Sequence, residues 1–266
     1  MYYLYKEHRI YGINENNKLL LPPSEKVISI AKKYGWKDED IIKMNLPRWD
    51  KYIDNEKKSL FPHNAKIKRN SIFVMFTWRH IKKYKSISKY YINNILNLIL
   101  NDKLNRKLKN NNITLYLSFH RLIDEKIVNK IKNFTIENSY IQFIEQNEIS
   151  ECLKETSLVI SDFSSIIFDL MYREKPFIIF IPDANDPFLK NIYKRDYYDL
   201  IQSIKNGTIY FENKFFDVNE TVNKICYYIN NNFEIEDKLK IFYDSFGLKK
   251  ENGIIDKFID YLSNLN

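Results

Sequence analysis

The apolar residues of this chain fall into short continuous runs that alternate with segments in which they recur every three or four positions. The continuous runs predict buried strands at 71–76, 113–117, 158–160 and 177–181. The segments with helical spacing predict helices at 90–108, 125–133, 149–155 and 165–173. Because strands that alternate with helices form βαβ units, the pattern predicts an α/β fold with a doubly wound parallel sheet.

Weaker patterns flank this central region. Before it, strands are predicted at 18–23 and 41–44, and a helix at 25–33; after it, helices are predicted at 219–230 and 252–262. The sequence shows no internal repeat and no linker long enough to separate two independent domains. Ligands of doubly wound sheets bind at the carboxyl ends of the strands, so the loops that follow the strands are the candidate functional sites.

The composition is that of a globular protein, because 44% of the 266 residues are hydrophobic and 29% are charged. The five glycines lie too far apart to form a phosphate-binding loop, which excludes a P-loop and a GxGxxG dinucleotide site. Any phosphate must therefore be held by helix N-termini, hydroxyl groups and basic side chains. The formal net charge of +8 favours a polyanionic partner, and a lysine-rich compositional bias is the alternative explanation of the same charge.

Four features that the sequence lacks bear on the location and the partners of the protein. Cys152 and Cys226 are too few for a disulfide framework or a zinc site, which indicates a reducing compartment. No apolar run reaches the roughly 18 to 20 residues of a membrane span, and the start of the chain lacks the layout of a signal peptide. We therefore expect a cytoplasmic protein, with peripheral contact at the inner face of the cell membrane. No signature of a nucleic-acid-binding motif is present, so no nucleic-acid partner is expected.

Two loops combine a cation or an aromatic ring with polar groups. Arg48 lies in a proline-stiffened loop, and its guanidinium fork suits a phosphate; from the residues alone, a surface ion pair with Asp50 is the favoured alternative. Thr77 and Trp78 follow strand 71–76 and offer a hydroxyl group and an aromatic face to a nucleotide. A tryptophan at the edge of the core is the alternative explanation.

A third loop contains a histidine. Ser118, Phe119 and His120 follow the predicted strand 113–117. A histidine at the mouth of a parallel sheet suits acid–base chemistry near neutral pH, whereas a lone histidine is more often structural. His120 is therefore a candidate catalytic residue with a structural alternative.

A fourth loop joins the buried strand 158–160 to a helix. Ser164 and Ser165 fall at the predicted N-terminus of this helix, where free N–H groups favour an anion. Asp169 lies four residues after Ser165 and so shares one helix face with it. Ordinary helix capping by Asp162 and Ser164 is the equal alternative from the residues alone.

Taken together, four motifs resemble the CDP-glycerol glycerophosphotransferase family, which includes teichoic-acid polymerases and capsule enzymes. The motifs lie, in the family's order, at 46–50, 76–79, 117–120 and 160–169. The resemblance implies the C-terminal half of a GT-B-type pair of Rossmann-like domains, with 18–266 as the domain that binds a CDP-alcohol and carries C-terminal helices. Residues 1–17 would be a connector to a missing N-terminal domain. The residues that the resemblance places around the donor are Arg48, Thr77, Trp78, Ser118, Phe119, His120, Ser164, Ser165 and Asp169, with His120 as the catalytic histidine.

Two features depart from the family pattern. The family's Trp-His-Gly-Thr motif, upstream of the arginine loop, does not occur here, and His8 is a poor substitute. Family members also tend to carry arginine where Ser118 stands. Two explanations stay open: a truncated or split protein whose partner subunit supplies the rest, and a chain that has lost the activity.

The expected function is the transfer of an alcohol phosphate from CDP-glycerol or CDP-ribitol to a teichoic-acid or capsule polymer, with a polyol-phosphate acceptor. The donor is a substrate, no cofactor is expected and no metal site is predicted, while metal dependence and the identity of the alcohol stay open. One alternative is a GT-B glycosyltransferase that uses a nucleotide sugar. Another is a non-catalytic nucleotide-binding module that partners a complete polymerase.

Overall fold

The computed structural model describes residues 22, 24–33, 36–53, 70–79, 82, 86–120, 123, 125–136 and 138–264. The chain forms two compact units. The unit that we call the sheet unit comprises 65–164 and 175–236, and the one that we call the helical unit comprises 1–64, 165–174 and 237–266. The connector predicted at 1–17 and its boundary lie outside the described residues, as does almost all of the strand predicted at 18–23.

The sheet unit is built on six parallel strands in the order β3-β2-β1-β4-β5-β6. This is the strand order of the dinucleotide-binding Rossmann fold, so the predicted doubly wound parallel sheet is confirmed. The chain reverses direction across the sheet between β1 and β4, which is the topological switch point. The strands are β1 (Ser71–Phe76), β2 (Thr114–Phe119), β3 (Ile141–Phe143), β4 (Leu158–Ser161), β5 (Phe177–Phe180) and β6 (Lys214–Phe215).

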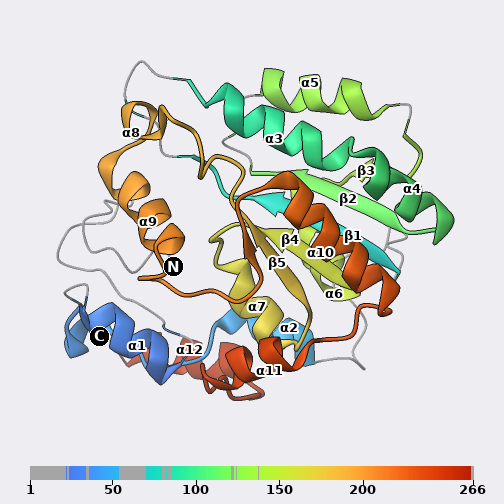
Figure 1. Cartoon of the computed structure of the whole chain (residues 1–266). Coiled ribbons are helices and arrows are strands. Elements are labelled where there is room, and N and C mark those ends of the chain that lie inside the picture. Colours follow the sequence, from blue (N-terminus) through green and yellow to red (C-terminus); the bar gives the residue numbers. More distant parts are fainter. Residues whose placement is uncertain are drawn as a thin grey trace. The chain divides into compact units, whose positions relative to one another are not determined.

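Helices of the sheet unit cover both faces of the central strands. Figure 1 shows α3, α4 and α10 together over one face, where Ile72, Val74 and Phe76 of β1 join the main apolar cluster. Phe73 points to the opposite face by strand alternation and is fully buried as well, which explains why β1 is a continuous apolar run. The helices are α3 (Lys89–Ile99), α4 (Asp102–Asn110), α5 (Glu125–Thr135), η4 (Gln146–Glu148), α6 (Ile149–Glu155), α8 (Leu189–Ile192), α9 (Arg195–Lys205) and α10 (Val218–Asn230).

The single helix predicted at 90–108 is wrong, because the chain forms two helices there. The Asn101 side chain accepts hydrogen bonds from the backbone N–H groups of Lys103 and Leu104, at 3.1 and 3.2 Å, and so begins a new helix. An asparagine at an N-cap position satisfies N–H groups that a helix start leaves unpaired. The apolar stripe continues through both helices, which is why the spacing alone did not reveal the break.

The helical unit buries Trp49 against α7. The Trp49 ring is fully buried and stacks on Tyr172, with ring centroids 4.1 Å apart. The Asp50 carboxylate accepts hydrogen bonds from the backbone N–H groups of Ile254 and Ile255, at 3.0 and 2.7 Å, and so fixes the start of α12. The elements are α1 (Glu25–Lys33), η2 (Asp38–Asp40), η3 (Pro47–Trp49), α2 (Asp50–Ile53), α7 (Ile166–Tyr172), α11 (Asp237–Asp244) and α12 (Ile254–Ser263).

The strand predicted at 41–44 is wrong, since Ile41 forms only an isolated bridge and the residues after it form no strand. None of the helices that the structure describes has both the length and the apolarity that a membrane crossing requires.

Candidate functional site

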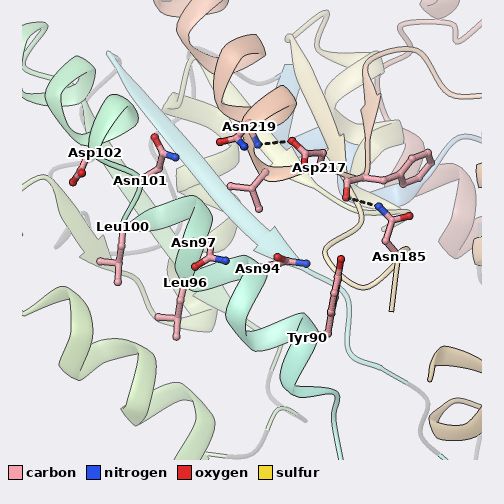
Figure 2. A pocket seen from close by; sticks show the side chains of 12 residues that line it. Tyr90, Asn94, Leu96, Asn97, Leu100, Asn101, Asp102, Asn185, Asp217 and Asn219 are labelled. Atoms are coloured by element: carbon pink, nitrogen blue, oxygen red, sulfur yellow. Dashed lines mark hydrogen bonds between the residues drawn. The ribbon is translucent and has the colours of Figure 1, made fainter. Parts of the chain in front are cut away.

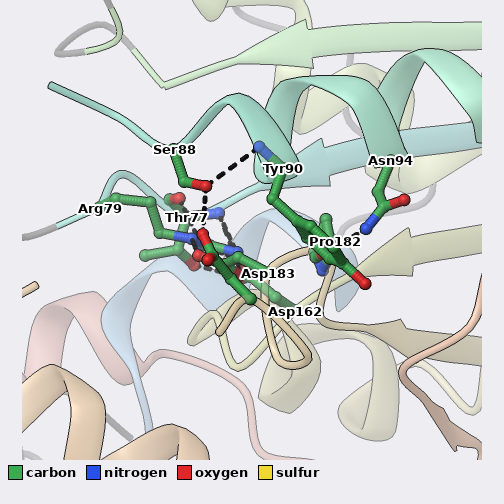
Figure 3. Close-up of polar contacts among 9 residues, drawn as sticks. Thr77, Arg79, Ser88, Tyr90, Asn94, Asp162, Pro182 and Asp183 are labelled. Carbon is green, nitrogen blue, oxygen red and sulfur yellow. Dashed lines mark hydrogen bonds and ion pairs between the residues drawn. The ribbon is translucent and has the colours of Figure 1, made fainter. Parts of the chain in front are cut away.

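One buried arginine joins the carboxyl ends of β1, β4 and β5. Arg79 donates from Nε and Nη2 to the two carboxylate oxygens of Asp183, at 2.8 and 2.9 Å, and from Nη1 to Asp162 at 2.5 Å. The Asp162 carboxylate also accepts from Thr77, from its backbone N–H at 3.0 Å and its hydroxyl at 2.5 Å. We call Thr77, Arg79, Asp162 and Asp183 the arginine tie (Figure 3). It lies beside the topological switch point, where doubly wound sheets bind their ligands.

Aromatic rings enclose the guanidinium of Arg79. Its carbon lies 4.4 Å from the ring centre of Tyr91, 5.4 Å from that of Phe163 and 5.5 Å from that of Tyr197. Burial by itself would lower the pKa of Arg79, but the two carboxylates of the tie raise that pKa well above its ordinary value. The arginine therefore stays charged, and it holds its neighbours with charge-assisted hydrogen bonds.

The start of α3 is fastened to the loop that follows β5. The Ser88 hydroxyl donates to the Asp186 carboxylate and accepts from the backbone N–H of Tyr90 at 3.0 Å. The side-chain amide of Asn94 donates to the carbonyl of Pro182, next to the arginine tie, at 2.6 Å (Figure 3). The loop that carries Asp183 is therefore held from α3 as well as from Arg79.

The end of β2 lies at the same edge of the sheet. Ser118 pairs with Met75 of β1 in the strand register, and Met75 pairs with Ser161 of β4, so the three strands end together. β2 extends to Phe119, two residues further than predicted, which places Ser118 inside the strand and buries its hydroxyl. His120 is the first residue after the strand and is half-buried. Since neighbouring strands lie about 4.8 Å apart, the ends of β2 and β4 are separated by roughly 10 Å.

In the loop after β4, Asp162 and Ser165 do not act as ordinary helix caps. Asp162 is committed to the arginine tie, and the Ser165 side chain makes no capping hydrogen bond to α7. The capping explanation is therefore wrong for Asp162. Ser164 is half-buried and ends one stretch of the sheet unit, while Ser165 begins a stretch of the helical unit.

In the helical unit, Arg48 pairs with Asp169. Arg48 Nε and the indole N–H of Trp49 both donate to Asp169 Oδ1, at 2.8 and 2.6 Å. The expected surface pair between Arg48 and Asp50 is wrong, because the Asp50 carboxylate instead accepts from the start of α12. Burial raises the pKa of the Asp169 carboxyl, and the hydrogen bonds from Arg48 and Trp49 only partly oppose this rise. The predicted residues Arg48 and Asp169 are thus brought together.

A groove of about 520 Å³ opens elsewhere on the sheet unit. It is lined mainly by polar residues of α3 and of the start of α10, including Asn94, Asn97 and Asn219 (Figure 2). None of the predicted site residues lines it. Within the described ranges, no three His, Cys, Asp or Glu side chains gather in a way that could hold a metal ion.

The sequence model of the CDP-glycerol:poly(glycerophosphate) glycerophosphotransferase family matches residues 6–253, which is most of the chain. The chain belongs to this family. The resemblance indicated by the four motifs is therefore confirmed. The sheet edge described above is thus part of a member of this family.

Curated relatives of this family member act in teichoic-acid synthesis, by their names. The minor teichoic acid biosynthesis protein GgaB of Bacillus subtilis (strain 168) is 30% identical over 88% of this chain and 25% of its own length. The teichoic acid poly(glycerol phosphate) polymerase of Bacillus spizizenii is 25% identical over 83% of this chain and 52% of its own length. The chain thus spans about a quarter to half of these relatives.

A solved structure outside the family has a similar fold. The UDP-GlcNAc 2-epimerase from Neisseria meningitidis superposes with a TM-score of 0.51 at 14% identity, over 94% of this chain and 62% of that protein. At this identity the likeness concerns the fold, and it agrees with the Rossmann-like strand order of the family member.

The sequence singled out residues around the sheet edge but missed two that organise it. Arg79 stands in one of the recognised motifs yet was not chosen as a site residue, and Asp183 was not considered at all. The available signal was a charged residue within a few positions of the end of a buried strand, as Arg79 is after β1 and Asp183 after β5. Such residues need a partner when they are buried, and the structure supplies it.

Proposed function

We propose that this chain is the nucleotide-binding part of a transferase that moves an alcohol phosphate from CDP-glycerol or CDP-ribitol to a teichoic-acid or capsule polymer. The observation that carries the proposal is membership of the glycerophosphotransferase family over residues 6–253. The relatives include a teichoic acid poly(glycerol phosphate) polymerase and a teichoic acid poly(ribitol-phosphate) polymerase, and their names support both alcohols equally.

The donor is proposed to lie at the carboxyl edge of the sheet, against the ends of β1, β2 and β4. Thr77, Trp78, Ser164 and the segment from Ser118 to His120 are the sheet-unit residues assigned to it. The placement of His120 and Ser164 after strands that end in register supports this assignment, since both follow strands next to β1. Arg48, Ser165 and Asp169 belong to the helical unit, and their contact with the donor stays a prediction from the resemblance.

The hydroxyl group of Ser118 is buried and is not available to a donor at the sheet edge. Its oxygen lies inside the sheet and has no hydrogen-bond partner among the described residues. Ser118 is therefore assigned to the donor site through its backbone and its neighbours Phe119 and His120, and its own side chain has no proposed role in binding.

The proposed reaction is a phosphoryl transfer. A terminal hydroxyl of the polymer attacks the distal phosphorus of the CDP-alcohol, a new P–O bond forms, and the bond between that phosphorus and the oxygen of CMP breaks. The hydroxyl proton passes to a base, and CMP leaves with the electron pair. His120 is the proposed acid–base residue, either toward the acceptor hydroxyl or toward the departing phosphate. Positioning and charge neutralisation supply most of the catalysis in this chemistry.

The proposed substrates also suggest a cellular location for the protein. A cytoplasmic location with peripheral contact at the inner face of the membrane would bring the enzyme to both a soluble CDP-alcohol and a growing polymer. The net charge of +8 supports contact with an anionic polymer or an anionic lipid surface.

The experiment is a donor screen that measures release of the nucleoside monophosphate or diphosphate. The chain is incubated with CDP-glycerol, CDP-ribitol and UDP-sugars, each with a glycerol-phosphate oligomer as acceptor. Release of CMP from a CDP-alcohol is the expected result. Release of UDP from a nucleotide sugar would instead identify a glycosyltransferase. Binding of CDP without any turnover would favour the non-catalytic module.

A further inference from the structure

Every polar atom of Thr77 makes a hydrogen bond within the arginine tie. The backbone N–H and the hydroxyl of Thr77 donate to Asp162, and the backbone carbonyl accepts from Arg79 Nη1 at 2.8 Å. A residue held at its N–H, its C=O and its side chain has one conformation available. Because Trp78 is the next residue, the tie also fixes the position of the backbone that carries the Trp78 side chain.

Asp162 transmits the same constraint to the loop after β4. Its side chain is fully buried and accepts hydrogen bonds from Thr77 and Arg79. Ser164 lies only two residues further along the chain. Between them, Phe163 is fully buried and packs edge-on against Tyr197, with ring centroids 5.4 Å apart. The two residues before Ser164 are therefore both fixed.

Asp183 holds the far side of the tie. Its two oxygens accept from two nitrogens of the guanidinium, which fixes the plane of Arg79 as well as its position. A single hydrogen bond would leave the guanidinium free to rotate. With Arg79 oriented from β5, its remaining nitrogen points to both Asp162 and the Thr77 carbonyl.

The free-energy cost of burying these charged groups indicates that the arginine tie does more than stabilise the fold. Burying ions is expensive, and a set of well-packed apolar residues is often as stable as a buried ion pair. Buried ionic groups bring a defined geometry in return, and that is what a site for a diphosphate ester requires.

We propose that Arg79 and Asp162 are positioning residues that fix the loops at Thr77–Trp78 and Phe163–Ser164 relative to each other, so that both can contact one cytidine nucleotide. This inference rests on the proposed function. Neither residue touches the reacting atoms: Arg79 acts through Asp162, and Asp162 acts through Thr77 and the loop that leads to Ser164.

The test compares Asp162→Asn and Arg79→Lys with Asn101→Ala. Asn101 caps α4 in the same unit, away from the tie, so its variant provides a loss of stability without a change in the loops. CMP affinity is measured by titration calorimetry at a fixed interval below the melting temperature of each variant. Hydrogen exchange of the two loop segments is measured in parallel by mass spectrometry.

We expect Asp162→Asn to weaken CMP binding about 10-fold or more, since an amide cannot replace a carboxylate that accepts three donors. Arg79→Lys should weaken it by a smaller factor, and Asn101→Ala should leave it unchanged. Exchange should rise in both loop segments of the first two variants only. An equal loss of affinity in Asn101→Ala, or unchanged loop exchange in Asp162→Asn, would overturn the proposal. If the wild-type protein does not bind CMP, the proposed function fails, and the exchange result alone decides whether the tie fixes the loops.

Discussion

Removing the Asp169 carboxylate should reveal how far the helical unit depends on it. In Asp169→Ala the indole N–H of Trp49, a fully buried side chain, loses its acceptor at 2.6 Å. An unsatisfied buried donor costs about 1 to 3 kcal/mol. The lost pair with Arg48 adds at most about 1 kcal/mol, because the Arg48 side chain is 42% exposed and water screens the interaction. The expected loss is about 2 to 3 kcal/mol, which corresponds to a fall in Tm of roughly 4 to 12 °C.

Asp169→Asn is the matched control. The amide oxygen can still accept from Trp49, so this variant should stay within about 1 kcal/mol of the wild type at neutral pH. Thermal unfolding followed by tryptophan fluorescence measures both variants. If Asp169→Ala melts at the wild-type temperature, or if Asp169→Asn loses as much as Asp169→Ala, the carboxylate does not hold Trp49 as described.

A comparison of the wild type with Asp169→Asn also gives a pH test. Burial raises the pKa of Asp169 in the folded chain, so the folded state binds a proton more tightly than the unfolded state does. The resulting stabilisation is fully present below the unfolded pKa and is lost as the pH rises through the folded pKa. The wild type should therefore gain stability relative to Asp169→Asn as the pH falls from neutral toward about 4. A constant difference across this range would contradict the raised pKa.

Two further predictions concern His120 and Asp50. His120→Ala should lower CMP release from a CDP-alcohol about 100-fold or more while its far-UV circular dichroism stays that of the wild type, and full turnover in this variant would refute the assigned role. Asp50→Ala should cost about 1 kcal/mol and raise hydrogen exchange at the start of α12, because Ile254 and Ile255 lose the acceptor of their N–H groups; unchanged exchange there would show that the cap is dispensable.

The sheet could be predicted where its strands are buried on both faces. β1, β2, β4 and β5 each contain a short run of mainly apolar residues, and that pattern identified each of them. β3 and β6 were missed because they are edge strands of three and two residues, too short to show any periodicity. Strand order then required the three-dimensional structure, since the sequence gives the elements but not their neighbours.

The site could be predicted as a set of loops but not as a set of contacts. Asp50 was favoured as the partner of Arg48 because it is close in sequence, whereas the true partner, Asp169, is 121 positions away. Arg79 and Asp183 are separated by 104 positions, and only the adjacency of β1, β4 and β5 brings them together. Pairings between residues so far apart depend on the tertiary arrangement of the elements, and the periodicity of side chains carries no information about it.

The most direct test of the account is whether the protein distinguishes bases. CDP, UDP and GDP carry the same diphosphate, so a site that holds only phosphate would bind them equally. Calorimetric titration of the wild-type chain with each nucleotide should give the tightest binding for CDP, together with the largest rise in Tm. Equal affinities and equal shifts for the three nucleotides would contradict the proposal that this chain binds a cytidine-linked donor.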